Sequence, residues 1–149
     1  MKQIEGSYRS GVGPQVLWAA LSDPVRLGEA LPDVGLVEVH DAERFSASVR
    51  PSTNLGVTAL QLELRIAEQT EGERVRIVGD GSAGEHRVAF DVELRFAASE
   101  GGGSEVGWSA EVQAFGGLGS LTQRVLPMLL RDQVSIVLAT AERQAGALA

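Results

Sequence analysis

The chain has 149 residues, of which 13 are Lys or Arg and 20 are Asp or Glu, so its formal net charge is −7 at pH 7. A chain of this length buries enough surface to form one core, and we expect a single domain over residues 1–149. The negative charge and the lack of any basic run remove the main source of nucleic-acid affinity, so no nucleic-acid partner is expected.

The sequence contains no Cys and two His. Thiolate nucleophiles, disulfides, iron–sulfur clusters and sulfur-ligated zinc sites are therefore excluded. His40 and His86 lie in separate segments without the spacing of metal ligands, so we expect no metal and no cofactor. The N-terminus lacks the apolar core of a signal peptide, and no segment approaches the ~18 apolar residues of a membrane span. These features predict a soluble cytoplasmic protein.

The first elements in chain order are a strand and two short helices. Apolar and polar residues alternate over residues 4–8 and predict the strand. Pro14 is suited to the first position of a helix, which continues through the sequence PQVLWAAL. The Asp23-Pro24 pair interrupts this helix, and VRLGEAL forms a second one.

A period of two in the apolar residues predicts six strands between residues 35 and 115. The expected strands lie around residues 36–39, 45–49, 60–66, 75–78, 88–96 and 106–114. The breaks near Asp41, at Glu71 and at residues 101–103 are short enough for hairpins. Each long strand carries apolar side chains on one face and charged side chains on the other.

The remainder of the chain, after residue 119, has the apolar spacing of one long helix. Pro127 lies within it and predicts a kink or a short break, because a backbone hydrogen bond is lost there. The apolar face of the sheet has to be covered, and this helix is the only large element left to cover it. The predicted fold class is therefore α+β, an antiparallel sheet of about seven strands wrapped around a long C-terminal α-helix.

Three stretches carry a family resemblance: PQVLWAALSDPVRLGEALPDV at residues 14–34, VRIVGDGSAGEHRVAFDVELRF at 75–96 and VQAFGGLGSLTQRVL at 112–126. They resemble the SRPBCC (START-like, helix-grip) superfamily and, within it, the carbon monoxide dehydrogenase G-subunits. The resemblance implies the helix-grip fold and an accessory or carrier role beside a molybdenum-containing dehydrogenase. It also implies transient contact with the inner face of the membrane or its quinone pool.

The apolar inner face is the candidate binding site. It could be a filled core, but the chain has only seven aromatic residues, and small side chains leave space for an apolar ligand. Together with the resemblance, this favours an apolar small molecule or lipid, with menaquinone as one candidate. Its mouth is expected near Leu118, Leu121 and Pro127. The candidate lining residues are Phe45, Leu62, Leu64, Phe90, Val92, Trp108, Leu121, Val125, Met128 and Leu129.

The alternative function is an enzyme similar to the polyketide cyclases or hydrolases of the same superfamily. It would use His86, or Glu111 if the strand register were shifted by one residue so that Glu111 pointed inward. Carboxylate pairs such as Asp91 and Glu93 are expected to face solvent, and no Ser stands beside a His–Asp relay. The preferred interpretation is therefore a binding protein without catalytic activity.

Glycines and arginines complete the sequence pattern. The GDGSAG segment at residues 79–84 predicts a hairpin turn or bulge rather than a phosphate loop, because it has no following Lys and no following helix. Gly116, Gly117 and Gly119 predict either a strand-to-helix corner or a hinge for the long helix. Cross-strand acidic neighbours on a solvated face are expected for Arg65, Arg74, Arg76, Arg87 and Arg95.

Overall fold

The structure is a computed structural model of the 149-residue chain, and it describes all residues except 1, 33, 51–59, 84–85, 116–119 and 149. The side chains of residues 2, 86, 120–127, 129, 147 and 148 are also outside the described part. In chain order the elements are β1 (Lys2–Ser10), α1 (Pro14–Leu21), α2 (Pro24–Ala30), β2 (Val34–Val39), β3 (Arg44–Val49), β4 (Leu60–Thr70), β5 (Arg74–Ala83), β6 (His86–Ala98), a 3-10 turn (Glu100–Gly102), β7 (Ser104–Phe115) and α3 (Ser120–Leu148).

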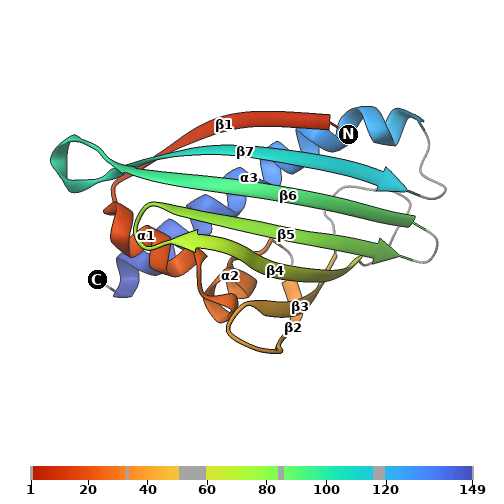
Figure 1. Cartoon of the computed structure of the whole chain (residues 1–149), viewed down its shortest axis with the longest axis horizontal. Coiled ribbons are helices and arrows are strands. Elements are labelled where there is room, and N and C mark those ends of the chain that lie inside the picture. Colours follow the sequence, from red (N-terminus) through yellow and green to blue (C-terminus); the bar gives the residue numbers. More distant parts are fainter. Residues whose placement is uncertain (1, 33, 51–59, 84–85, 116–119, 149) are drawn as a thin grey trace.

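The seven strands form one antiparallel sheet in the order β1-β7-β6-β5-β4-β3-β2. Helix α3 crosses one face of this sheet, and α1 and α2 lie near the C-terminal part of α3 (Figure 1). The predicted α+β helix-grip architecture is therefore confirmed. Helix α3 is continuous through Pro127, so the short break considered from the sequence does not form.

The two short helices begin where their prolines predict. Pro14 occupies the first turn of α1, and the N–H of Ser22 donates to the carbonyl of Trp18 to end it. Helix α2 begins at Pro24, and the side chain of Asp23 accepts a hydrogen bond from the N–H of Val25 at 3.0 Å. This cap satisfies a backbone donor that the helix itself leaves unpaired.

The core lies between the inner face of the sheet and the three helices. Leu17 and Leu21 of α1 are fully buried, and so is Leu138 of α3. They pack against the apolar side chains that alternate along the strands. The buried strand residues of this core are Phe45, Leu64, Ile66, Val75, Ile77, Val92, Leu94, Phe96, Val106, Trp108 and Ala110.

A hydrogen bond from the Tyr8 hydroxyl to the Glu142 carboxylate joins β1 to α3. The other carboxylate oxygen of Glu142 accepts from the N–H of Gly11 at 3.2 Å. Burial of Tyr8 raises its pKa to about 12, and Glu142 adds to this shift. The same hydrogen bond holds the pKa of Glu142 below its usual value. Helix α3 is thereby fixed to the first strand at its C-terminal part.

Gly79 and Gly81 lie inside β5, so the prediction of a turn or bulge at residues 79–84 is wrong for these two positions. Gly84, the third glycine of that segment, is outside the described residues. A Cβ at residue 79 would lie 2.8 Å from the Phe90 ring and 2.8 Å from the carbonyl oxygen of Glu63. A Cβ at residue 81 would lie 2.8 Å from Leu62. The two glycines therefore let Phe90 and Leu62 approach the sheet closely.

The Tyr8–Glu142 hydrogen bond predicts a pH-dependent stability. The variant Tyr8→Phe should lower the free energy of unfolding by about 1 to 3 kcal/mol at pH 7, since a hydrogen bond to a charged group is lost. Because folding raises the pKa of Tyr8 from 10.0 to about 12, its contribution is complete below pH 10 and is lost as the pH rises toward 12. Urea unfolding at pH 7, 9 and 11 measures this.

The difference in stability between wild type and Tyr8→Phe should therefore shrink between pH 9 and pH 11. A difference that stays constant over this range would contradict the assignment of the stabilising interaction to the protonated hydroxyl of Tyr8.

The close approach at β5 predicts that Gly79→Ala destabilises the protein by about 1 to 3 kcal/mol, because the new methyl group meets a backbone oxygen that cannot move aside. Gly146→Ala is the matched control. Gly146 lies in α3 with open space around its Cα, so this substitution should gain about 0.5 to 1 kcal/mol of helix stability. Equal thermal unfolding midpoints for the two variants would contradict the packing described for Gly79.

Candidate ligand-binding site

Burial of the inner face decreases along the strands toward the end where β5 passes into β6, which we call the hairpin end. On β6, Leu94 and Val92 are buried, whereas Phe90 and Val88 are half-buried. The same change occurs on β4, where Leu64 is 5% exposed and the side chains nearer the hairpin end are half-buried. The apolar face is thus fully covered beside α1, whereas at the hairpin end the half-buried Leu62, Val88 and Phe90 alternate with Ala47, Gly81 and Val112, which stay buried.

The strand register brings these half-buried side chains together. Leu62, Gly81, Val88 and Ala114 are successive partners across four strands. The neighbouring row contains Gly79 beside Phe90. The described inner-face side chains in these two rows are apolar or glycine; Lys2, which ends the second row on β1, has its side chain outside the described part.

The predicted lining residues divide between the core and this surface. Phe45, Leu64, Val92 and Trp108 are buried at 8% exposure or less and belong to the core. Leu62 and Phe90 are half-buried and pack against that core.

The structure describes only some of the predicted lining side chains of α3. Met128 is 66% exposed. The side chains of Leu121, Val125 and Leu129 lie outside the described residues, as do Leu118 and the glycines of the expected corner or hinge. The ligand-lining role of all ten residues stays a prediction.

Trp108 and Trp18 have structural contacts within the fold. The ring of Trp108 lies over Gly6 of β1, and the guanidinium of Arg131 stands 5.7 Å from its centre. Arg131 thus contributes a cation–π contact between α3 and the sheet. The indole N–H of Trp18 donates to the carbonyl of Arg74 at 3.0 Å and fixes α1 against β5.

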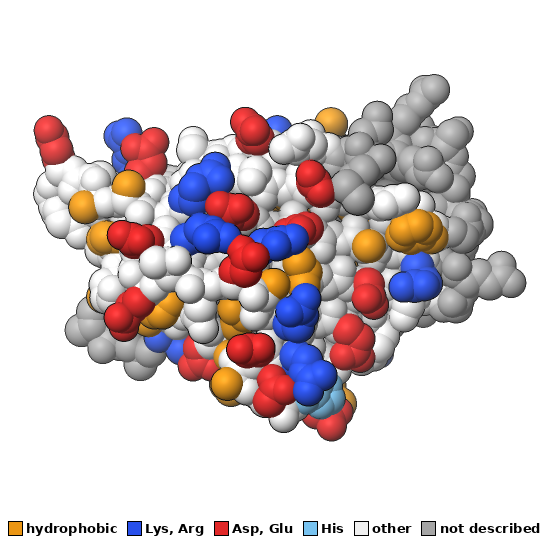
Figure 2. All heavy atoms as spheres, in the orientation of Figure 1, with side chains coloured by type: hydrophobic (Ala, Val, Ile, Leu, Met, Phe, Trp, Pro, Cys, Tyr) orange, Lys and Arg blue, Asp and Glu red, His pale blue; other side chains and the backbone are white. Residues whose placement is uncertain are grey.

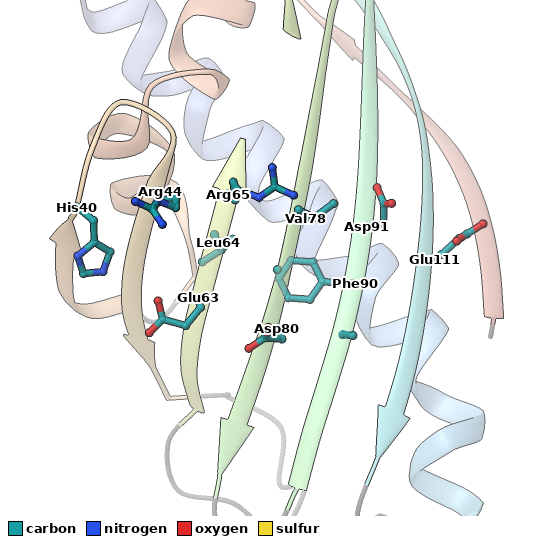
Figure 3. A pocket seen from close by; sticks show the side chains of 12 residues that line it. His40, Arg44, Glu63, Leu64, Arg65, Val78, Asp80, Phe90, Asp91 and Glu111 are labelled. Carbon is teal, nitrogen blue, oxygen red and sulfur yellow. The ribbon is translucent and has the colours of Figure 1, made fainter. Parts of the chain in front are cut away.

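A second candidate site is a groove of about 770 Å³ on the outer face of the sheet, opposite α3 (Figure 3). Its lining comes from the β2–β3 turn and from β3 to β7. The lining residues are His40, Arg44, Glu63, Leu64, Arg65, Val78, Gly79, Asp80, Ala89, Phe90, Asp91 and Glu111.

A hydrogen-bonded chain of three side chains forms the rim of this groove. Ser46, which is 6% exposed, donates its hydroxyl hydrogen to Glu63 at 2.6 Å. The Nε2 atom of His40 lies 2.6 Å from the same hydroxyl oxygen. Because the hydroxyl hydrogen is already donated to Glu63, Nε2 acts as the donor to this oxygen. A serine nucleophile would instead give its proton to the histidine, so this order does not match a catalytic triad.

The residues of the enzyme alternative do not meet on the inner face. Glu111 lines the outer groove, so the one-residue register shift that would turn it inward does not occur. The side chain of His86 is outside the described part. Among the described residues, no group of three His, Asp or Glu side chains is arranged to hold a metal ion.

The outer groove was missed from sequence, although a signal for part of it is present. Ser46 and Ser48 alternate with three buried apolar residues of β3, which indicates a polar but covered outer position. Nothing in the sequence pattern indicated that Glu63 and His40 meet at Ser46.

No helix in the part of the chain that the structure describes has the length and apolar composition needed to cross a bilayer.

Solved structures with this fold come from several organisms. A conserved protein from Geobacillus kaustophilus superposes with a TM-score of 0.86 at 12% identity, covering 98% of this chain and 96% of that one. A Thermus thermophilus protein gives 0.74 at 13% identity over 99% of both chains. Ara h 8.0201 gives 0.67 at 13% identity over 98% of both. At these identities the similarity establishes the fold alone.

Comparison of the sequence identifies the family, which the structural similarity does not. A search of curated proteins gives no significant match. The model of the family of carbon monoxide dehydrogenase G-subunits (CoxG) matches residues 6–145, which include every helix and strand at least in part. This match agrees with the helix-grip fold and with the resemblance carried by residues 14–34, 75–96 and 112–126. The chain therefore belongs to the CoxG family of carbon monoxide dehydrogenase G-subunits.

Proposed function

We propose that this protein binds a neutral apolar molecule, such as a quinone, between the hairpin end of the sheet and α3. The observation that carries the proposal is the partly covered apolar surface formed by Leu62, Val88 and Phe90 beside Gly81. Half-buried apolar side chains on neighbouring strands are a surface that water solvates poorly.

The chemistry of this surface favours an uncharged ligand. The described inner-face side chains at the hairpin end include no acid and no base, so a charged group placed there would lose its hydration without gaining an ion pair. Covering about 200 Å² of apolar surface contributes roughly 5 kcal/mol before the entropic costs of association are subtracted. A ligand with a long hydrocarbon part, such as menaquinone, would supply this area.

The proposed role is that of an accessory or carrier beside a molybdenum-containing dehydrogenase, as the family name suggests. The chain has no Cys and so no ligands for an iron–sulfur cluster, and we assign the redox step to the partner. Delivery of a quinone would require transient contact with the inner face of the membrane. The net charge of −7 opposes adsorption to anionic lipid, so apolar side chains would provide this contact.

The binding proposal is tested by placing a side chain at residue 81. Gly81→Val should push Leu62 away from β5 and narrow the space between sheet and helix, because the new Cβ overlaps the Leu62 side chain. We expect wild type to bind menaquinone-4 with a Kd below about 100 μM, and the variant to bind at least about fivefold more weakly. Quenching of tryptophan fluorescence and native mass spectrometry measure binding.

Gly107→Val is the matched control, since Gly107 lies on the outer face of β7 and a Cβ added there would be 4.0 Å from its nearest neighbour atom. This variant should retain the wild-type affinity. Absence of binding to wild type, or the same loss of affinity in both variants, would rule out the hairpin end as the binding site.

A further inference from the structure

The outer face of the sheet contains two regions in which the charged side chains are arranged differently. In the first, toward the α1 end, acidic and basic side chains pair across β4, β5 and β6, as Figure 2 shows. Arg76 binds Asp91 through two nitrogens, at 2.9 and 2.5 Å, and reaches Glu68 at 3.3 Å. Arg74 and Arg95 pair with Glu93 in the same region. The charges of this region are largely neutralised within the molecule.

The second region is the outer groove, where like charges stand opposite each other. Glu63 on β4 is the direct register partner of Asp80 on β5. Asp91 on β6 is the direct partner of Glu111 on β7. Like charges at directly opposed positions destabilise a sheet. This arrangement contrasts with the paired charges one row away on the same face.

Internal partners relieve only part of this repulsion. Asp91 is neutralised by Arg76, and Glu63 accepts a hydrogen bond from Ser46. Across the described residues, Asp80 and Glu111 take part in no ion pair within 4.0 Å. The groove therefore presents carboxylates on two sides of its floor.

The floor between these carboxylates is apolar. Val78 and Ala89 are half-buried and lie on adjacent strands at neighbouring register positions. Asp80 and Glu111 lie two strands apart and two register positions apart along the strands, roughly 12 Å in all, so a single cationic group cannot contact both. A fitting occupant carries two positive charges joined by an apolar part.

The exposure of the rim distinguishes between kinds of occupant. Glu63 and Arg65 are exposed, and the groove is open to solvent rather than enclosed. Small-molecule sites enclose most of their ligand, whereas a chain segment can lie along an open surface and hold it by several side chains. The groove geometry therefore suits an extended polypeptide.

We propose that the outer groove docks an extended basic segment of a partner protein. One Lys or Arg of the segment binds Asp80 and Glu63, a second binds Glu111, and an apolar side chain between them covers Val78 and Ala89. The groove lies on the face of the sheet opposite α3, and Leu64, Gly79 and Phe90 of the inner-face row also line it.

Neutralising Arg65 should change the docking affinity in the direction opposite to removal of the carboxylates. Its side chain lies across β5 beside Val78 (Figure 3), where it would repel a basic segment. Removal of this charge should strengthen docking, whereas removal of the carboxylates should weaken it.

The experiment uses a fluorescein-labelled, N-acetylated and C-amidated peptide of sequence KVKVKVK, titrated with the full chain and followed by fluorescence anisotropy at low salt. The double variant Asp80→Asn, Glu111→Gln should bind at least about fivefold more weakly than wild type, and Arg65→Gln should bind more tightly. The control double variant Glu100→Gln, Glu105→Gln carries the same change in net charge outside the groove and should match wild type.

The proposal would be overturned by no binding to wild type up to about 1 mM peptide, by an equal loss of affinity in the control double variant, or by weaker binding by Arg65→Gln. Displacement of the peptide by spermine at the peptide's own affinity would also overturn it and would assign the groove to small polyamines. Circular dichroism confirms that each variant is folded.

Discussion

The hydrogen bond between Tyr8 and Glu142 fixes α3 to β1 near the helix C-terminus, at the end of the sheet where the apolar face is buried most completely. Beside it, Leu17, Leu21 and Leu138 complete the core against the strands. Further along the strands, toward the hairpin end, the same alternation continues while the cover becomes thinner. One sheet thus includes both the stable core and the surface proposed to bind a ligand.

The two faces of the sheet differ because successive side chains of a strand point in opposite directions. On β5, Ile77 and Gly79 face the helix side while Val78 and Asp80 face outward. Neighbouring residues of a single strand therefore point toward two different candidate sites, although Gly79 and Phe90 border both. An apolar ligand on one face and a protein partner on the other would be bound by the same strands.

Most of the fold was predictable because it depends on local patterns. Periodicity of two, Pro14 and the Asp23-Pro24 pair correctly predicted all seven strands and both short helices. The strand glycines were misinterpreted because their role depends on Phe90 and Leu62, which approach from neighbouring strands. The outer groove was missed for the same reason, since its charges become unusual only through cross-strand register.

The glycines of β5 let Phe90 and Leu62 lie as close to the sheet as they can, so a substitution there can only move these side chains away from it. Phe90 and Leu62 can lie close to the backbone because residues 79 and 81 have no Cβ. Any other amino acid at these positions would raise them toward α3, and none could lower them further. Substitution at residues 79 and 81 can therefore only reduce the space above the inner face, and only a shorter side chain at residue 62 or 90 would enlarge it.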